Sequence, residues 1–413
     1  MLLIKNIGLL QTPVGSASAK GEAQAHNLKI KNAAILIEDG FIKAVFEGGE
    51  LPFCDKSVDT LDAEGSLATP GWIDCHTHLV FGGWRQHEVP LKLRGASYLE
   101  ILRAGGGILD TVRHTRETSE DALYEKSRAF LNEMFAHGVT AVEGKSGYGL
   151  DLEHELKQLR VMKRLNETQP VEVVSTFMGA HAVPEEYAGD GDGYIEYLCR
   201  DVLPKVKEER LARFADVFCE DSVFNVEQSH KYLQAAQALG LGAKIHADEI
   251  EEIGGARLAG ELHAVSAEHL IATGEQGMEA LATGNVTAVL LPQTSFYLNK
   301  PFAQARRMIE LNIPIAIASD FNPGSSPSCN LQLAANLGYL KYRMQPAEVL
   351  TAVTLNAACA IGLGDRLGTI EPGKQADIVL WEAPDMEMLC YRFGSNLAHT
   401  VIKKGELQHV KRT

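Results

Sequence analysis

The segment Gly71-Trp72-Ile73-Asp74-Cys75-His76-Thr77-His78 is a short apolar run that ends in two histidines. Successive side chains of a β-strand point to opposite faces, so His76 and His78 lie on the same face. Two imidazoles at the end of one strand can supply half of a metal site. The H-x-H pattern also occurs by chance, and two unrelated loop histidines are the alternative at this point.

Seven more apolar runs follow this one and alternate with helical patterns. Eight strands that alternate with helices predict an α/β fold of the (β/α)₈ kind, a TIM-like barrel. A doubly wound sheet is the alternative, but no early G-x-G-x-x-G motif supports it. The expected strands are Gly71–His78, Val139–Lys145, Val171–His181, Phe214–Glu220, Gly242–Glu249, His263–His269, Val286–Leu291 and Ile313–Asp320.

The two ends of the chain are rich in β-forming residues. Apolar runs at 33–37 and 41–45 flank an Asp39-Gly40 turn, which is typical of a hairpin. Residues 368–381 form a turn followed by a second β-rich run. We therefore predict a small β-sandwich domain made of residues 1–68 and 366–413, and a barrel that spans residues 69–365. Residues 82–119 are long for a βα loop and predict a lid or insertion with a short helix near 98–103.

Composition limits the possible functions. The 413 residues carry a formal net charge of −15, which argues against a nucleic-acid or anionic-membrane surface. The seven cysteines are scattered without C-x-x-C spacing, which favours a reducing compartment. We find neither a signal-peptide pattern nor an apolar run long enough to cross a membrane. The chain is therefore expected in the cytoplasm, with no membrane partner. A homodimer is expected because it is the commonest assembly of soluble oligomeric proteins.

Two further polar clusters follow apolar runs of the expected barrel. His246 ends one run and is followed by Glu249, and Asp320 ends another run before the small-residue loop 321–327. Because the βα loops ring one mouth of a barrel, His246 and Asp320 can meet the H-x-H pair there as a metal site. For Asp320 a simple turn cap is the alternative.

Other residues near the expected site suit supporting roles. Glu249 is placed for proton transfer, with a carboxylate favoured by a helix dipole as the alternative. His269 also ends an apolar run and is a candidate catalytic histidine. We expect Asp74 to support one of the ligand imidazoles.

Five motifs together resemble the imidazolonepropionase family of the amidohydrolase superfamily. They are PGWIDCHTHLVFGGWR at 70–85, SGYG at 146–149, GAHAVP at 179–184, HADE at 246–249 and SDFNPGSSP at 319–327. The resemblance extends along nearly the whole chain, including EPGKQADIVLW at 371–381. It implies hydrolysis of the cyclic amide of 4-imidazolone-5-propionate to N-formimino-L-glutamate, in histidine degradation, by metal-activated water.

The resemblance also implies residue roles. It assigns the binding of zinc or iron to His76, His78, His246 and Asp320, and contacts with substrate or product to Arg85, Tyr148, His181, Glu249, Asn322, Gly324 and Ser325. In the implied mechanism Glu249 transfers the proton, His269 stabilises the oxyanion and Asp320 orients the water. The fourth expected strand lacks the lysine that bridges two metals in many superfamily members, so one divalent metal is expected.

These residue types fit a small substrate that carries a carboxylate. Arg85 can bind a carboxylate with two parallel hydrogen bonds, with a surface ion pair as the alternative. Tyr148 and His181 follow neighbouring strands and face the same mouth. A core-packed tyrosine is the alternative, although Gly147 and Gly149 make tight packing around it less expected. The loop with Asn322, Gly324 and Ser325 offers neutral donors.

Two other functions remain open from the sequence. A cytosine- or guanine-type aminohydrolase on the same scaffold is the first, because the HADE motif suits those deaminases as well. A catalytically inactive relative that serves as an assembly protein is the second. Such a protein should have lost metal ligands, and all four are present.

Overall fold

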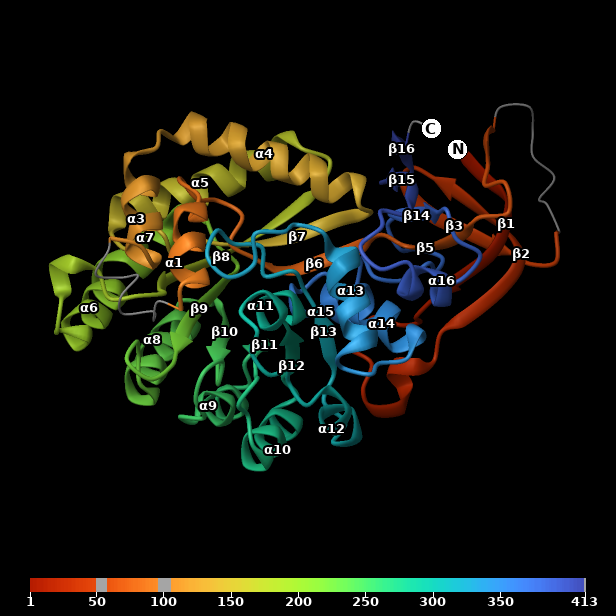
Figure 1. Cartoon of the computed structure of the whole chain (residues 1–413). Coiled ribbons are helices and arrows are strands. Elements are labelled where there is room, and N and C mark those ends of the chain that lie inside the picture. Colours follow the sequence, from red (N-terminus) through yellow and green to blue (C-terminus); the bar gives the residue numbers. More distant parts are fainter. Residues whose placement is uncertain (50–57, 96–104, 412–413) are drawn as a thin grey trace.

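The computed structural model describes residues 1–49, 58–95 and 105–411, and a ring of eight parallel strands dominates it (Figure 1). The strands follow one another in the order β13-β12-β11-β10-β9-β8-β7-β6. All eight predicted strands are confirmed, with ends shifted by a few residues. Their bounds are β6 Trp72–Thr77, β7 Val139–Lys145, β8 Glu172–Ala180, β9 Phe214–Cys219, β10 Gly242–Ala247, β11 Ser266–His269, β12 Thr287–Leu290 and β13 Ile315–Ile317.

Backbone hydrogen bonds at the ends of the first and last strands bring the ring together. Asp320 N–H donates to the carbonyl of His76 at 3.1 Å, and His78 N–H donates to the carbonyl of Phe321 at 2.9 Å. The segments after β6 and β13 therefore lie side by side at the carboxyl ends of the strands. In a (β/α)₈ barrel this is the end that carries the active site.

Helices surround the ring, and several of them begin at a side chain that caps the first turn. Ser119 accepts from the N–H of Ala122 before α4, and Asp151 accepts from the N–H of His154 before α5. The helices are α1 Val89–Leu93, α3 Ile108–Glu117, α4 Glu120–Ala136, α5 Leu152–Thr168, α6 Gly191–Tyr197, α7 Leu203–Glu208, α8 Val226–Ala238, α9 Gly255–Glu261, α10 Glu275–Gly284, α11 Pro292–Tyr297, α12 Ala305–Glu310, α13 Leu331–Leu340, α14 Pro346–Val353, α15 Leu355–Ala360 and α16 Met386–Tyr391. Short helical turns span Gly21–Ala25, Gln86–Glu88, Glu185–Tyr187 and Leu198–Val202.

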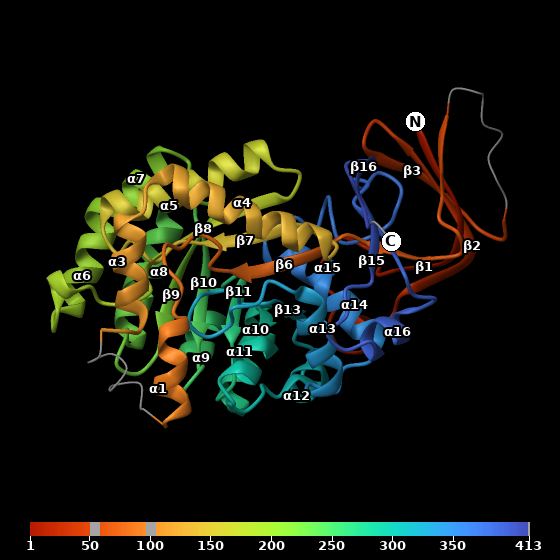
Figure 2. The ribbon, with the colours of Figure 1, turned by 45° about the horizontal axis from the view of Figure 1, so that its top comes forward.

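The two ends of the chain share one mixed sheet beside the barrel (Figure 2). Its order is β16-β15-β14-β5-β1-β2-β3, and β4 pairs with β1. The antiparallel pair of β5 with β14 joins the N-terminal and C-terminal parts, and the predicted hairpin is the pair β2–β3. The strands are β1 Leu2–Thr12, β2 Leu28–Glu38, β3 Phe41–Phe46, β4 Asp59–Asp62, β5 Leu67–Pro70, β14 Ile378–Trp381, β15 Ala398–Lys403 and β16 Glu406–Val410.

The sheet from the termini packs against the barrel where β6 begins. The rings of Trp72 and Trp381 lie 4.8 Å apart, and the indole of Trp381 donates to Thr69 at 2.9 Å. Gly138, with φ +92°, lies against Trp381, and a Cβ there would come within 2.9 Å of the ring. This contact anchors the start of β6, the strand that carries the H-x-H pair.

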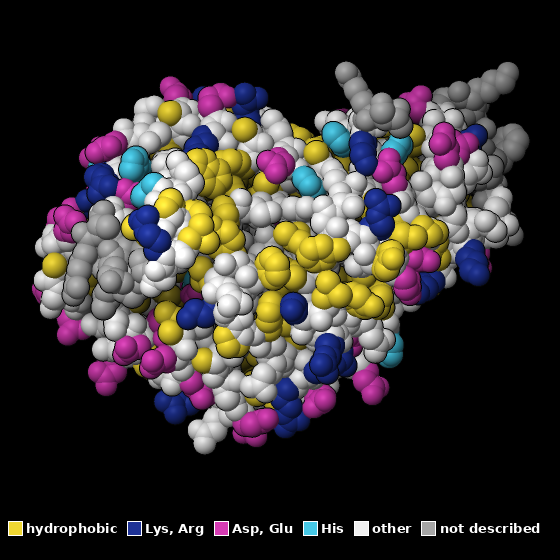
Figure 3. Space-filling model, viewed as in Figure 1, with side chains coloured by type: hydrophobic (Ala, Val, Ile, Leu, Met, Phe, Trp, Pro, Cys, Tyr) yellow, Lys and Arg dark blue, Asp and Glu magenta, His cyan; other side chains and the backbone are white. Residues whose placement is uncertain are grey.

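The long segment after β6 carries the short helices α1 and α3. The helix predicted near 98–103 lies outside the described residues. On the face in Figure 3, acidic and basic side chains are interspersed. Within the described ranges, no helix combines the length and apolar character needed to cross a membrane.

Candidate active site

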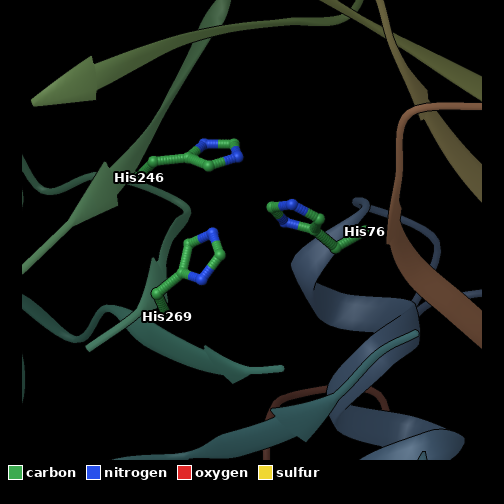
Figure 4. Close-up of side chains that lie close together, drawn as sticks. All are labelled: His76, His246 and His269. Atoms are coloured by element: carbon green, nitrogen blue, oxygen red, sulfur yellow. The ribbon is translucent and has the colours of Figure 1, made fainter. Parts of the chain in front are cut away.

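Three histidines from three strands turn their rings toward one another at the carboxyl end of the barrel (Figure 4). They are His76 of β6, His246 of β10 and His269 of β11. The ring centroids of His76 and His246 lie 4.6 Å apart, and those of His246 and His269 lie 5.2 Å apart. One ligand atom of each lies within 4.8 Å of the others, so the three could hold a metal ion.

A second triad shares His76 with the first. Ligand atoms of His76, His78 and Asp320 also lie within 4.8 Å of one another. Oδ1 of Asp320 is 3.4 Å from Nε2 of His76 and 3.7 Å from Nε2 of His78. Asp320 has φ +53°, and its other carboxylate oxygen accepts from Thr294. The four predicted ligands are thus brought together, and His269 lies beside them.

Buried carboxylates fix the orientation of two of these imidazoles. Nδ1 of His76 lies 3.0 Å from Glu268, and Nδ1 of His246 lies 3.1 Å from Asp216. Nε2 of each ring is buried and has no hydrogen-bond partner among the residues that the structure describes. Burial also holds the pKa of His76 well below its usual range and that of His246 at about 3, so both rings are neutral. A proton on Nδ1 leaves the Nε2 lone pairs free, which is what a metal requires.

A fully buried network of charges lies behind these carboxylates. The ammonium of Lys145 is 2.7 Å from Asp216 and 3.0 Å from Glu143, and that of Lys244 is 2.9 Å from Glu143. Burial alone would lower the pKa of Lys145, but Asp216 and Glu143 raise it. Lys145 therefore remains charged, and the contacts of both lysines hold the carboxylates in place.

Sequence reasoning missed this network, although a signal for it is present. Glu143 and Lys145 are two residues apart on β7, and Lys244 and His246 are two residues apart on β10. Residues at this spacing share one face of a strand, so these polar groups lie together on the inward face of largely apolar strands. The expected role of Asp74 was wrong. Asp74 accepts from the N–H and hydroxyl of Ser319 and so supports the segment that leads to Asp320, whereas Glu268 and Asp216 support the imidazoles.

Replacing Asp216 with asparagine is expected to weaken metal binding by about 10–100-fold, the usual effect of losing a partner that orients a ligand. The amide NH₂ would face the Lys145 ammonium, so the side chain would turn and misalign His246. Competition with a chromophoric chelator measures the affinity. Asp221→Asn, an exposed change after the same strand, is the control. An unchanged metal affinity in Asp216→Asn would show that Asp216 does not contribute to metal binding.

Glu249 lies beside the histidine cluster. Its carboxylate is 3.6 Å from Nε2 of His269, and its side chain is 17% exposed. Burial, helped by the negative charge of Glu220, raises the pKa of Glu249 to about 7. Glu220 also accepts from the N–H groups of Ile250 and Glu251, at 2.8 and 3.1 Å, and so fixes the loop. A carboxyl group with a pKa near neutrality can both accept and return a proton.

Tyr148 and His181 line the same mouth. The ring of His181 stacks on His78 at 4.9 Å, and the Tyr148 ring lies 5.3 Å from His181. Tyr148 is only 3% exposed. The expectation of loose packing around it was wrong, because Gly147 and Gly149 allow their neighbours to approach closely.

Arg85 and the loop after Asp320 meet at this mouth. Arg85 donates to both carboxylate oxygens of Glu88, at 2.9 and 3.2 Å. A Cβ at Gly324 would collide with the guanidinium of Arg85, so the loop packs directly on it. The N–H groups of Gly324 and Ser325 each donate to the Asn322 side chain at 2.8 Å. The loop is thus built around Asn322.

Comparison with known proteins agrees with this architecture. The model of the amidohydrolase family matches residues 67–407. Among solved structures, 5-methylcytosine deaminase from Klebsiella pneumoniae superposes with a TM-score of 0.75 at 16% identity, over 100% of this chain and 98% of that one. Atrazine chlorohydrolase from Arthrobacter aurescens complexed with zinc gives a TM-score of 0.69 at 17% identity, over 98% and 95%. These likenesses show the fold.

The fold, the histidine–aspartate cluster and the family match define a metal-dependent amidohydrolase. An imidazolonepropionase from Caldanaerobacter subterraneus subsp. tengcongensis is 48% identical over 402 residues, which is 97% of this chain and 96% of that protein. The chain belongs to the imidazolonepropionase family.

Proposed function

We propose that this chain hydrolyses the cyclic amide of 4-imidazolone-5-propionate to N-formimino-L-glutamate. The observation that carries the proposal is the match to imidazolonepropionases along nearly the full length of both chains. The geometry supports it, because one barrel mouth combines a metal-binding cluster, a carboxyl group with a raised pKa and an arginine.

His76, His78, His246 and Asp320 would hold one divalent metal, either zinc or iron. Nitrogen donors from histidine together with one carboxylate oxygen suit both ions. The buried Nε2 atoms of His76 and His246 support this assignment, because within the described part of the chain neither has a hydrogen-bond partner. When bound, the metal supplies a nucleophile from water at neutral pH and polarises the amide carbonyl.

The chain's own groups then move the protons. Glu249 takes the proton of the attacking water and gives it to the ring nitrogen as the carbon–nitrogen bond breaks. His269, 3.6 Å from Glu249, donates a hydrogen bond to the carbonyl oxygen as negative charge develops there. Asp320, held by Thr294, orients the water.

Arg85, whose guanidinium lies against Gly324, would bind the propionate group of the substrate. Glu88 already binds one edge of that guanidinium, through Nε and Nη2, and so fixes its direction. Tyr148 lies close enough for the positive charge of Arg85 to act on its phenol, although burial raises the pKa of Tyr148 overall. Asn322 and Ser325 provide neutral polar groups in the adjoining loop.

Arg85→Ala is expected to raise KM by about 10–100-fold with a much smaller change in kcat, since a charged hydrogen bond present in both ground and transition states is lost. Arg85→Lys should recover little, because lysine lacks the planar pair of donors. Steady-state kinetics at varied substrate concentration measures both constants. Arg94→Ala, an exposed change in the same segment, is the control. An unchanged KM in Arg85→Ala would exclude Arg85 from substrate binding.

The direct test follows the ultraviolet absorbance of enzymatically generated imidazolone propionate, with and without a chelator. We expect loss of absorbance, formation of N-formimino-L-glutamate and inhibition by the chelator. Release of ammonia from cytosine or guanine, with imidazolone propionate untouched, would instead establish the deaminase alternative.

A further inference from the structure

Two side chains of α5 accept hydrogen bonds from the backbone of the loop that carries Tyr148. Glu155 accepts from the N–H groups of Gly147, Gly149 and Leu150 at 3.1, 2.8 and 2.9 Å. Gln158 accepts from the N–H of Tyr148 at 3.1 Å. Four consecutive backbone N–H groups are therefore satisfied by one helix.

Gly147 connects this support to the substrate side of the loop. Its N–H donates to Glu155, and its carbonyl accepts from Nδ1 of His181 at 3.0 Å. Gly147 has φ +108°, and a Cβ there would come within 2.8 Å of His181. His181 in turn stacks on His78. Direct contacts thus connect α5, through Gly147 and His181, to His78, one of the predicted metal ligands.

The second support, Gln158, ties the loop to the segment that follows β6 and the H-x-H pair. Gln158 donates through its amide to the carbonyl of Val80 at 2.7 Å while its oxygen holds the N–H of Tyr148. Arg116 holds the other side of the loop by donating to the carbonyl of Gly149 at 2.7 Å. Because all these hydrogen bonds must form at once, they restrict the loop to a narrow range of conformations.

Glu155 is fully buried, which is costly for a carboxylate. Burial raises its pKa, and its hydrogen bonds to the loop oppose that rise. A carboxylate has only acceptor atoms, so both oxygens can serve converging N–H donors. A glutamine at this position would turn an NH₂ group toward donors and would break part of the arrangement.

We propose that Glu155 and Gln158 are positioning residues that set the affinity for substrate by holding Tyr148 and His181 at the barrel mouth. Neither side chain is part of the metal cluster or of the proton-transfer pair. This inference rests on the proposed function, because it takes Tyr148 and His181 to contact the substrate, as the family resemblance implies. It predicts that changes in α5, behind the loop, act on KM.

The test is Glu155→Gln with steady-state kinetics on imidazolone propionate. We expect KM to rise roughly tenfold or more, with kcat within about threefold of wild type, because interactions made equally in ground and transition states are weakened. Metal content should equal that of wild type. Glu153→Gln, an exposed change on the same helix, is the matched control and should leave KM unchanged.

A second variant keeps the test decisive if Glu155→Gln folds poorly. Gln158→Met retains the length of the side chain, removes the acceptor for Tyr148 N–H and should also raise KM. The proposal is overturned if every folded variant keeps the wild-type KM. It is also overturned if melting temperature, metal content and kcat fall together without a rise in KM. An inert wild-type chain would overturn the proposed function and this inference with it, whereas an active wild type with unaffected variants overturns this inference alone.

Discussion

Replacing Glu249 with glutamine is expected to lower kcat by about 10²–10⁴-fold, the usual contribution of a positioned general acid–base group. Glutamine matches glutamate in size but cannot accept the proton of the attacking water. Metal content should stay at the wild-type level, because Glu249 belongs to neither group of residues that could hold the ion. Kinetics and metal analysis of the same preparation measure both quantities.

The pH profile gives a second measurement on Glu249. Burial raises its pKa to about 7, so the proton-accepting carboxylate is lost as the pH falls through that value. Wild-type kcat should therefore decline on the acid side, and the residual activity of Glu249→Gln should lack this decline. Glu251→Gln, an exposed change two residues further along, is the control and should behave as wild type. An undiminished kcat in Glu249→Gln would remove Glu249 from the mechanism.

The barrel could be predicted from the sequence because each strand is a separate local pattern. Apolar runs such as Phe214–Cys219 lie between helical segments, so the alternation is visible without any tertiary information. The same holds for the main site residues, since a polar side chain at the end of an apolar run falls at the carboxyl end of a strand. His76, His246 and Asp320 were predicted in this way.

Residues that act across strands could not be predicted from such patterns. Glu268 supports His76 from 192 positions away, and Asp216 supports His246 from 30. No local periodicity encodes these pairs, because they depend on which strands become neighbours in the ring and on the direction of each side chain. Asp74 was assigned wrongly for the same reason, since its nearest partner, Ser319, lies just after β13, the strand that closes the barrel.

Glycines misled the prediction for a different physical reason. Gly147 and Gly149 were taken to make tight packing around Tyr148 less expected, whereas at Gly147 the missing side chain lets His181 approach the backbone. The two interpretations differ only in what packs against the glycine, and that partner lies in another segment of the chain.

His76→Ala is expected to reduce bound metal and activity to background together. His76 is the side chain common to both groups of residues that could hold the ion, so its loss disrupts each of them. It also leaves the buried Glu268 carboxylate without its imidazole partner, which adds a cost to folding. Metal analysis, kinetics and thermal unfolding of one preparation measure these effects.

The control is His137→Ala, which removes a histidine at the end of α4 whose ring contacts only the local carbonyl of Glu133 among the described hydrogen bonds. It should keep metal and activity. Chelated wild-type protein should regain activity when zinc or iron is restored, whereas His76→Ala should not, because added ion cannot replace a missing donor. A metal-replete and fully active His76→Ala protein would contradict the ligand assignment, since the remaining side chains would then suffice to bind the ion and to position it for the reaction.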